Sequence, residues 1–312
     1  MTGRTDALVV GQVARDLVLA VDGVPGPRDT RPVRSRLEML GGKGANQAVA
    51  LTQLGVAAGV CGVVGDDDTG TWLIAQARRD GIDVSQVVRR AGTRTGLIVD
   101  VLTPDGQWRY LEDLPEPVLL TGADITAAVA AIAATRAVLV QLQQPSTAAL
   151  PAAETARRGG ALVVLDGAPA DDERREAILA TADVIRADDR EAAALTGTPV
   201  DSVDDAIRAG QKVLERGPRL VALAVPQTGN VFVWPDGYLC LPLPADRVVD
   251  TTGAGDAFTA ALVAALLHGE PPPVAARYAT AAASVAVGYP GGRPHLSAAA
   301  MRPYLRRLAD VH

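Results

Sequence analysis

The sequence is poor in cysteine and histidine. Its 312 residues include 2 cysteines, Cys61 and Cys240, which stand far apart and outside any Cys-x-x-Cys spacing, and 3 histidines. This composition excludes a scaffold held by disulfides and argues against a structural zinc site. A chain of this length buries enough apolar surface to fold without such cross-links, and we expect a single domain that spans residues 1–312.

Long apolar runs and a basic surface are also missing. The longest apolar stretches, 127–134 and 261–267, fall short of the roughly 20 residues that cross a bilayer. The N-terminus is too short in apolar residues for a signal peptide. A net charge of −6 does not provide the basic surface that binds nucleic acid. We therefore expect a cytoplasmic protein that has neither a membrane nor a nucleic acid as partner.

Short apolar runs alternate with helical patterns along most of the chain. Continuous apolar strands that alternate with helices are typical of a parallel sheet covered on both faces. The predicted strands are 7–13, 57–65, 137–142, 161–166, 183–187 and 219–225, with an antiparallel edge hairpin at 231–240. The predicted helices are 44–55, 68–81, 123–134, 147–158, 171–180, 189–196, 202–216, 254–268, 273–288 and 297–309. The sequence thus predicts an α/β fold with helices on both faces of the sheet.

Two early segments, 14–40 and 94–115, do not fit this layered pattern. The first contains the strand-like run 16–21, and the second reads as a hairpin with a turn signal at Asp105-Gly106. Together they predict a small separate sheet inserted in the domain. Ligands of α/β folds bind beyond the carboxyl ends of the parallel strands, so we expect this sheet to act as a lid there.

One glycine-rich motif, DTTGAGDAF (250–258), precedes a long apolar helix. Its small residues allow backbone N–H groups to turn inward, and a helix start offers unpaired N–H donors and a positive dipole end. Such a turn suits the negative charge of a transferring phosphoryl group, and Asp256 could accept a proton from an attacking hydroxyl. The alternative is an ordinary aspartate at a helix start after a glycine-rich turn.

A second motif, GGKGANQA (41–48), places paired glycines before another helix. Its Lys43 and Asn46 could donate hydrogen bonds to sugar hydroxyls, and Gly41-Gly42 could be a hinge or a point of close ligand approach. The alternative is an asparagine at a helix N-cap beside a solvated lysine. Phosphate-binding GxxxxGK[ST], dinucleotide-binding GxGxxG after the first strand, HExxH and GxSxG are all absent.

The two motifs together resemble the two signatures of the ribokinase-like (phosphofructokinase-B type) carbohydrate kinases, in the same order and at a similar separation. GVVGDDDTG (62–70) and VLVQLQQP (138–145) are most similar to ribokinases within that family. The resemblance implies a three-layer α/β/α sandwich with a mainly parallel central sheet and a small β-sheet lid. It also implies transfer of the ATP γ-phosphate, with Mg²⁺, to a primary hydroxyl of ribose or a related furanose or polyol. Ribokinases also use K⁺ and pair their lids in a homodimer.

Residue roles follow from the same resemblance. Asp256 matches the family's catalytic base, and Gly253, Ala254 and Gly255 match its anion hole. The sugar-binding positions are Asp16, Gly42, Lys43, Gly44, Asn46 and Gln143. The ATP-binding positions are Asp188, Gly229 and Thr280. Glu191 matches a glutamate that organises Mg²⁺ through water, and the monovalent cation positions are Asp250, Thr252, Ala286 and Gly291.

The sequence also departs from the ribokinase pattern. On the sugar side, Ala14 replaces an asparagine, Gln143 replaces a glutamate, and the lid segment LEDLPEPVLL (111–120) lacks a Gly-Ala-Asn. On the nucleotide side, Asp188 replaces an asparagine and VPQTG (225–229) carries Pro226 in place of a glycine, while Tyr289 and His295 replace an arginine and a serine in the cation loop.

These departures keep two alternatives open. The first is a nucleoside kinase of the same family, in which Trp108 or Tyr110 could stack on a base. The second is a non-catalytic member that binds sugar or nucleotide. A nucleotide-binding oxidoreductase rests on fold class alone.

Overall fold

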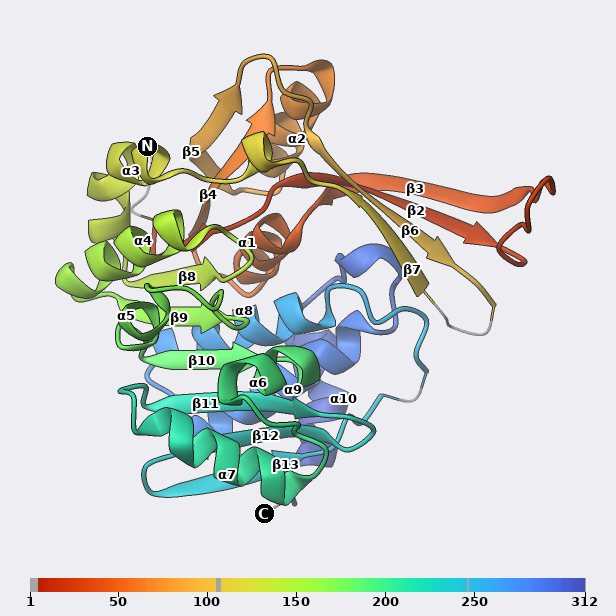
Figure 1. Ribbon diagram of the computed structural model, residues 1–312. Helices are drawn as coiled ribbons and strands as arrows, with labels where there is room; N and C mark the ends of the chain where they lie inside the picture. Colours follow the sequence, from red (N-terminus) through yellow and green to blue (C-terminus); the bar gives the residue numbers. More distant parts are fainter. Residues whose placement is uncertain (1–4, 105–107, 246, 312) are drawn as a thin grey trace.

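The structure, a computed structural model, describes residues 5–104, 108–245 and 247–311. Its centre is a nine-stranded sheet with the order β13-β12-β11-β10-β9-β8-β1-β4-β5 (Figure 1). Neighbours from β11 to β5 run parallel, and β12 and β13 form an antiparallel edge, which confirms the predicted mainly parallel sheet. The strands are β1 (Ala7–Val10), β4 (Ala58–Gly65), β5 (Asp83–Arg90), β8 (Ala137–Gln141), β9 (Leu162–Asp166), β10 (Val184–Ala187), β11 (Leu220–Val225), β12 (Gly229–Trp234) and β13 (Gly237–Leu241).

Helices cover both faces of this sheet. Side chains of β1 alternate between the faces, since Ala7 and Val9 join one buried cluster while Leu8 and Val10 join the other. The first cluster is covered by α1 (Lys43–Gln53), α2 (Asp68–Arg79), α8 (Ala254–Leu267), α9 (Pro272–Ala286) and α10 (Ala298–Leu308). The second is covered by α3 (Gly122–Ala133), α4 (Ser146–Arg158), α5 (Arg175–Leu179), α6 (Asp189–Thr196) and α7 (Val203–Leu214). The predicted three layers are therefore present.

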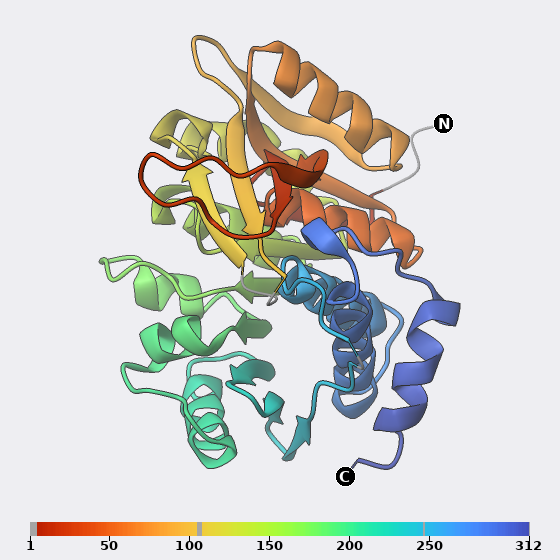
Figure 2. The same ribbon diagram turned by 90° about the vertical axis from the view of Figure 1, so that its right-hand side faces the viewer.

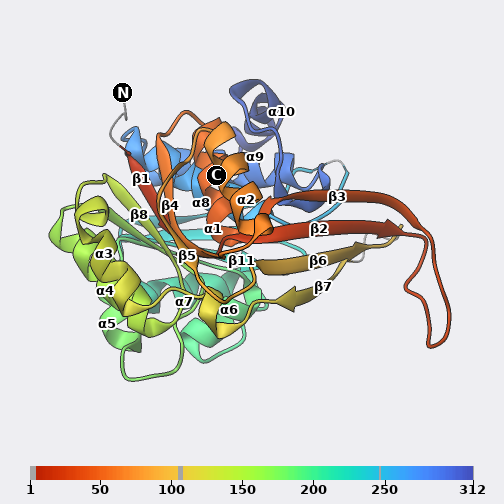
Figure 3. The same ribbon diagram turned by 90° about the horizontal axis from the view of Figure 1, so that it is seen from above.

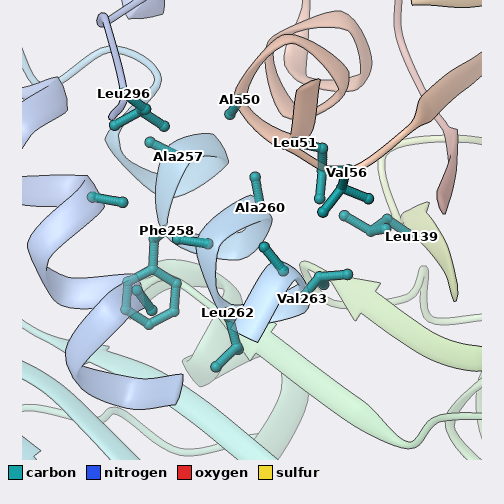
Figure 4. Close-up of a cluster of buried hydrophobic side chains, with 14 of the residues drawn as sticks. Ala50, Leu51, Val56, Leu139, Ala257, Phe258, Ala260, Leu262, Val263 and Leu296 are labelled. Atoms are coloured by element: carbon teal, nitrogen blue, oxygen red, sulfur yellow. The ribbon is translucent and has the colours of Figure 1, made fainter. Parts of the chain in front are cut away.

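Helix α8 lies in the middle of one of these cores. It is apolar on all sides, as expected of a fully enclosed helix. Ala257 and Ala260 lie near Ala50 of α1 (Figure 4), while the ring of Phe258 stacks on Phe232 of β12 with centroids 5.4 Å apart. Because the body of the helix is packed all round, its N-terminal turn is held at a defined place.

A second sheet of four strands extends from the body, with the order β3-β2-β6-β7 (Figures 1 and 3). Its strands are β2 (Ala14–Val21), β3 (Val33–Gly41), β6 (Gly96–Leu102) and β7 (Trp108–Asp113). A short link joins β1 to β2, and β3 leads directly into α1, so this sheet stands where the parallel strands end. Figure 2 views the molecule from that side. The turn signal at Asp105-Gly106 lies outside the described residues, and the lid role of segments 14–40 and 94–115 stays a prediction.

One segment, Glu116–Ala133, is long and apolar enough to cross a membrane by length and composition alone, although the sequence gives no expectation of such a span. In the structure it is divided. A short 3-10 helix (Glu116–Val118) is followed by extended backbone at Leu119, and α3 then begins after Thr121 with a capping box. The α-helix itself has 12 residues, and Ile125, Ala128 and Ile132 pack on the sheet.

Candidate active site

The two sequence motifs meet at one cavity. It has a volume of about 110 Å³ and lies between the second sheet, α1 and the start of α8. Asn46 and Asp256, 210 residues apart in sequence, are hydrogen-bonded there. The lining residues are Gln12, Asp16, Gly42, Lys43, Asn46, Ile98, Tyr110, Glu112, Gln143, Thr252, Gly253 and Asp256. Seven of them are predicted site residues, namely Asp16, Gly42, Lys43, Asn46, Gln143, Gly253 and Asp256, and an eighth, Thr252, belongs to the predicted cation set.

Asp256 occupies the first turn of α8 and is held by two amides. Nδ2 of Asn46 donates to its Oδ2 and Nε2 of Gln47 donates to its Oδ1, each at 3.2 Å. Burial raises the pKa of Asp256 to about 6, against the opposing charge of Lys43. The carboxyl group is thus ionised at neutral pH and more basic than an exposed aspartate, which suits a general base.

The turn before Asp256 requires glycine. Gly253, the N-cap of α8, has a φ of 70°, and a Cβ atom there would lie 2.3 Å from the Cα of Gly292. Ala254 and Gly255 follow as the first helical residues, and their backbone lies next to Asp256. No side chain of the described residues caps this helix start. The N–H of Ala254 donates to the carbonyl oxygen of Thr251 at 3.2 Å, whereas the N–H groups of Gly255 and Asp256 have no acceptor among the described residues and remain available to an anion.

The start of α1 forms the facing wall. Gly42 is its N-cap, with a φ of 80°, and its N–H donates to Oδ1 of Asp16 at 3.2 Å. Lys43 Nζ lies 3.3 Å from Oε1 of Glu191. Burial would lower the pKa of Lys43, but the charges of Asp166 and Glu191 outweigh it and the net shift is upward, so the amine stays charged.

Gly44 has a packing role at the same helix start. A Cβ atom there would lie 2.7 Å from the carbonyl oxygen of Gln12, so the glycine allows α1 to approach the β1–β2 link. This close approach brings Lys43 and Asn46 of α1 up to the cavity.

The second sheet contributes a row of polar side chains. Asp16 of β2 pairs with Ile98 of β6, which pairs with Glu112 of β7, so all three face the same side of the sheet. Burial and the nearby charges of Asp256 and Asp100 raise the pKa of Asp16 to about 7, although the Gly42 N–H opposes them. Glu112 is not among the predicted site residues.

Beneath the cavity lies a buried charged network. Nη1 of Arg186 on β10 lies 3.2 Å from Oδ1 of Asp166, which ends β9. Gln47 donates to the other oxygen, Oδ2, at 2.6 Å. Neither Arg186 nor Asp166 is a predicted site residue, yet each is a charged residue in an otherwise apolar strand, and that signal could have identified both.

The predicted cation loop is brought together by Asp250. This fully buried carboxylate accepts the N–H of Thr252 and the N–H of Gly291, each at 2.8 Å. Ala286 is the last residue of α9, and the carbonyl oxygen of the next residue, Val287, accepts the N–H of Asp250 at 3.2 Å. Asp100 of β6 accepts from Thr252 Oγ1 at 3.3 Å, and burial together with the Asp250 charge raises its pKa to about 7.

The predicted nucleotide residues are more dispersed. Asp188 is the N-cap of α6 and forms a capping box with Glu191. Gly229 begins β12 at the end of the β11–β12 turn, with a φ of 142°. Thr280 is wholly buried in α9, and its hydroxyl is one of the buried polar groups without a partner among the described residues. The structure does not bring these three residues into the cavity that Asp256 lines.

Comparison with known proteins places this chain and its fold in a family. Residues 4–299 match the profile of the pfkB family carbohydrate kinases. The chain belongs to this family. Its members are phosphotransferases that act on an alcohol group, and the predicted ribokinase-like fold is confirmed by the solved structures that it resembles. One of these is a ribokinase of Arabidopsis thaliana complexed with ribose and ATP, with a TM-score of 0.80, 26% identity and 99% of each chain covered.

Two curated relatives show the range within the pfkB family. An ATP-dependent ribose-1-phosphate kinase of Halopiger xanaduensis is 31% identical over 306 residues, which cover 97% of this chain and 99% of that protein. A bifunctional ribokinase/ribose-5-phosphate isomerase A of Fructilactobacillus sanfranciscensis is 30% identical over 260 residues, covering 83% of this chain. The chain spans 48% of the length of that bifunctional protein.

Proposed function

We propose that this pfkB-family protein is an ATP-dependent kinase of ribose or a related furanose or polyol, which phosphorylates a primary hydroxyl group. The observation that carries the proposal is the position of Asp256. Its carboxylate lies in the first turn of α8, beside uncapped backbone N–H groups, and opens into a cavity lined by hydrogen-bonding side chains. A general base and an anion-binding turn at one point are the two parts that phosphoryl transfer to a hydroxyl requires.

In the proposed reaction, Asp256 accepts the proton of the sugar hydroxyl as its oxygen forms a bond to the γ-phosphorus. The bond between that phosphorus and the bridging oxygen of ATP breaks, and ADP leaves. Asn46 and Gln47 hold both carboxylate oxygens of Asp256 at the cavity. The N–H groups of the turn 253–256 stabilise the negative charge of the transferring group, and Lys43 supplies a further positive charge.

The donors of the site fit the two expected cations. Mg²⁺ commonly uses one or two carboxylates together with phosphates and water, and Glu191 offers such a carboxylate beside Lys43. Within the described residues no group of three or more His, Cys, Asp or Glu could hold a metal by itself. When bound, Mg²⁺ would neutralise phosphate charge. The oxygens of Asp250, Thr252, Ala286 and Gly291 offer the hard donors that suit K⁺.

The polar lining favours a neutral, hydroxyl-rich substrate. Oδ1 of Asn46 is buried, has no partner in the part of the chain that the structure describes, and can accept from a hydroxyl group. Asp16 and Glu112 on the second sheet add carboxyl groups, which bind hydroxyls and, where they are ionised, repel anions. This arrangement supports an unphosphorylated sugar over a sugar phosphate. Tyr110 in the same lining leaves a nucleoside as the second candidate.

The test is ADP production from Mg²⁺-ATP with a panel of pentoses, hexoses, polyols, ribose 1-phosphate and nucleosides. We expect turnover with at least one neutral sugar, and Asp256→Asn as the control should lose it. A wild-type rate no greater than that of Asp256→Asn with every substrate would reject the kinase proposal and favour a non-catalytic binding protein. Repeating the active pair in Na⁺ and in K⁺ tests the cation loop, which predicts faster turnover in K⁺.

A further inference from the structure

Arg186 is a largely buried cation beside the anion-binding turn. It lies in β10, where its side chain is 14% exposed, and its Nη1 lies 3.2 Å from Asp166 and 3.6 Å from Oε2 of Glu191. Burial would lower the pKa of Arg186, but the charges of Asp166 and Glu191 outweigh it, so the guanidinium stays charged. A charged group this deep in the protein needs a reason beyond solubility.

The other side of the guanidinium faces helix α8. A Cβ atom at Gly255 would lie 2.6 Å from Nη2 and 3.0 Å from Cζ of Arg186, so the glycine leaves the space that the guanidinium fills. Gly255 is the residue before Asp256 and belongs to the predicted anion hole. Arg186 therefore stands next to the turn at which the transferring phosphoryl group would be stabilised.

The orientation of the Arg186 side chain is fixed by Asp166 on the neighbouring strand β9. Asp166 holds Nη1 through Oδ1, and its Oδ2 accepts from Gln47, which also donates to Asp256. One amide thus connects the carboxylate that positions Arg186 with the carboxylate proposed as the base. Because of this shared contact, the Arg186 guanidinium and the Asp256 carboxylate are held in a fixed position relative to each other. Preorganised charge stabilisation needs such a fixed geometry.

We propose that Arg186 is a catalytic residue that contacts the transferring phosphoryl group and adds a side-chain cation to the backbone N–H groups of the turn 253–256. Asp166 is the positioning residue that holds it there. Arg186 neither gives nor takes a proton; it stabilises the charge on the equatorial oxygens while the bond to ADP breaks and the bond to the sugar forms. The proposal rests on the kinase function proposed above.

The first test compares Arg186→Lys with Arg208→Lys, a matched change at an exposed arginine of α7. The lysine keeps one positive charge beside Asp166 but loses the planar fork that reaches Gly255. We expect kcat to fall about 10²–10³-fold, as for removal of an oxyanion donor, while KM for the sugar changes little. Arg208→Lys should keep the wild-type kcat. Wild-type kcat in Arg186→Lys would overturn the proposal.

A second variant separates catalysis from folding. In the pair Arg186→Gln with Asp166→Asn both of these charges are removed, and Glu191 keeps its ion pair with Lys43, so neither Asp166 nor Glu191 is left as an unpaired buried charge. If Arg186 served only to neutralise Asp166, this pair would retain kcat. We expect a folded protein, judged by its melting temperature, with the same large loss of kcat.

Binding of a phosphoryl mimic gives a readout apart from turnover. Wild-type protein should be stabilised more by ADP with Mg²⁺ and fluoroaluminate than by ADP with Mg²⁺ alone. The charge-neutral pair should lose this increment but keep the ADP effect, and an unchanged increment would contradict the proposal. If the wild type phosphorylates no substrate, the proposed function fails; if it is active and both Arg186 variants match it, only this inference fails.

Discussion

At the scale of single residues, the buried carboxyl of Asp256 predicts a pH profile. Its pKa is raised from the ordinary value of 3.8 to about 6, and it must be ionised to accept a proton. We therefore expect kcat/KM to fall about tenfold per pH unit below pH 6 and to level off above it. Steady-state rates between about pH 5 and about pH 8 would show this. A profile that stays flat down to pH 5 would exclude Asp256 as the base.

The same pKa shift predicts an effect on stability. A carboxyl whose pKa is higher in the folded than in the unfolded state contributes stability at low pH, and that contribution is lost as the pH rises through about 6. Near pH 8 the wild type carries a buried charge that Asp256→Asn does not. The variant should therefore melt a few degrees higher near pH 8, with the difference shrinking near pH 4. A variant less stable than wild type at both pH values would refute the shift.

Lys43 predicts a contrast between the only two lysines of the chain. Lys43 lines the cavity and pairs with Glu191, whereas Lys212 is exposed on α7. Arginine at position 43 would place a wide, planar guanidinium group between closely packed glycine backbones. Lys43→Arg should raise KM for the sugar about tenfold or more, and Lys212→Arg should leave it unchanged. If both changes left KM for the sugar equally unaffected, Lys43 would be a solvated surface residue that does not bind the sugar.

At the scale of elements, strand β7 predicts substrate choice. Glu112 shares a sheet face with Asp16, and both line the cavity. Glu112→Lys reverses one charge there and should shift the ratio of kcat/KM for ribose to that for ribose 1-phosphate by about tenfold towards the phosphate. Glu154→Lys, a change at a partly exposed residue of α4, is the control. An unchanged ratio would mean that β7 does not contact the sugar.

At the scale of the whole molecule, the second sheet predicts a homodimer. Strands β3 and β7 are the free edges of this sheet, and Leu111 of β7 is 66% exposed. Exposed apolar edge strands favour pairing with another chain. We expect a dimer in sedimentation experiments at micromolar concentration and a monomer for Leu111→Asp. Val129→Asp, at an exposed apolar residue of α3, should stay dimeric, and a monomeric wild type would reject the interface.

Sequence patterns predict best the strands that are buried along their whole length. The buried strands β4, β8 and β9 read as continuous apolar runs because helices cover both of their faces. Strand β5 is not predicted, since this edge strand reads DVSQVVRR and has only partly buried or exposed side chains. Strand β3 is not predicted as a separate strand and is covered only by the predicted lid segment 14–40. Its first half, Val33–Leu37, is exposed and therefore lacks an apolar pattern of burial.

The sequence alone determined the order of the helices and of the buried strands, and it contained the two motifs that meet at the cavity, because hydrophobic periodicity and glycine-rich turns are local properties. Tertiary structure decided which charges share the site. Arg186 and Asp166 meet because β10 and β9 are neighbours in register, and Glu112 shares a sheet face with Asp16 because β6 pairs with both β7 and β2. Strand order and register are set by packing between distant segments, and local sequence does not encode the distance from Arg186 to Gly255.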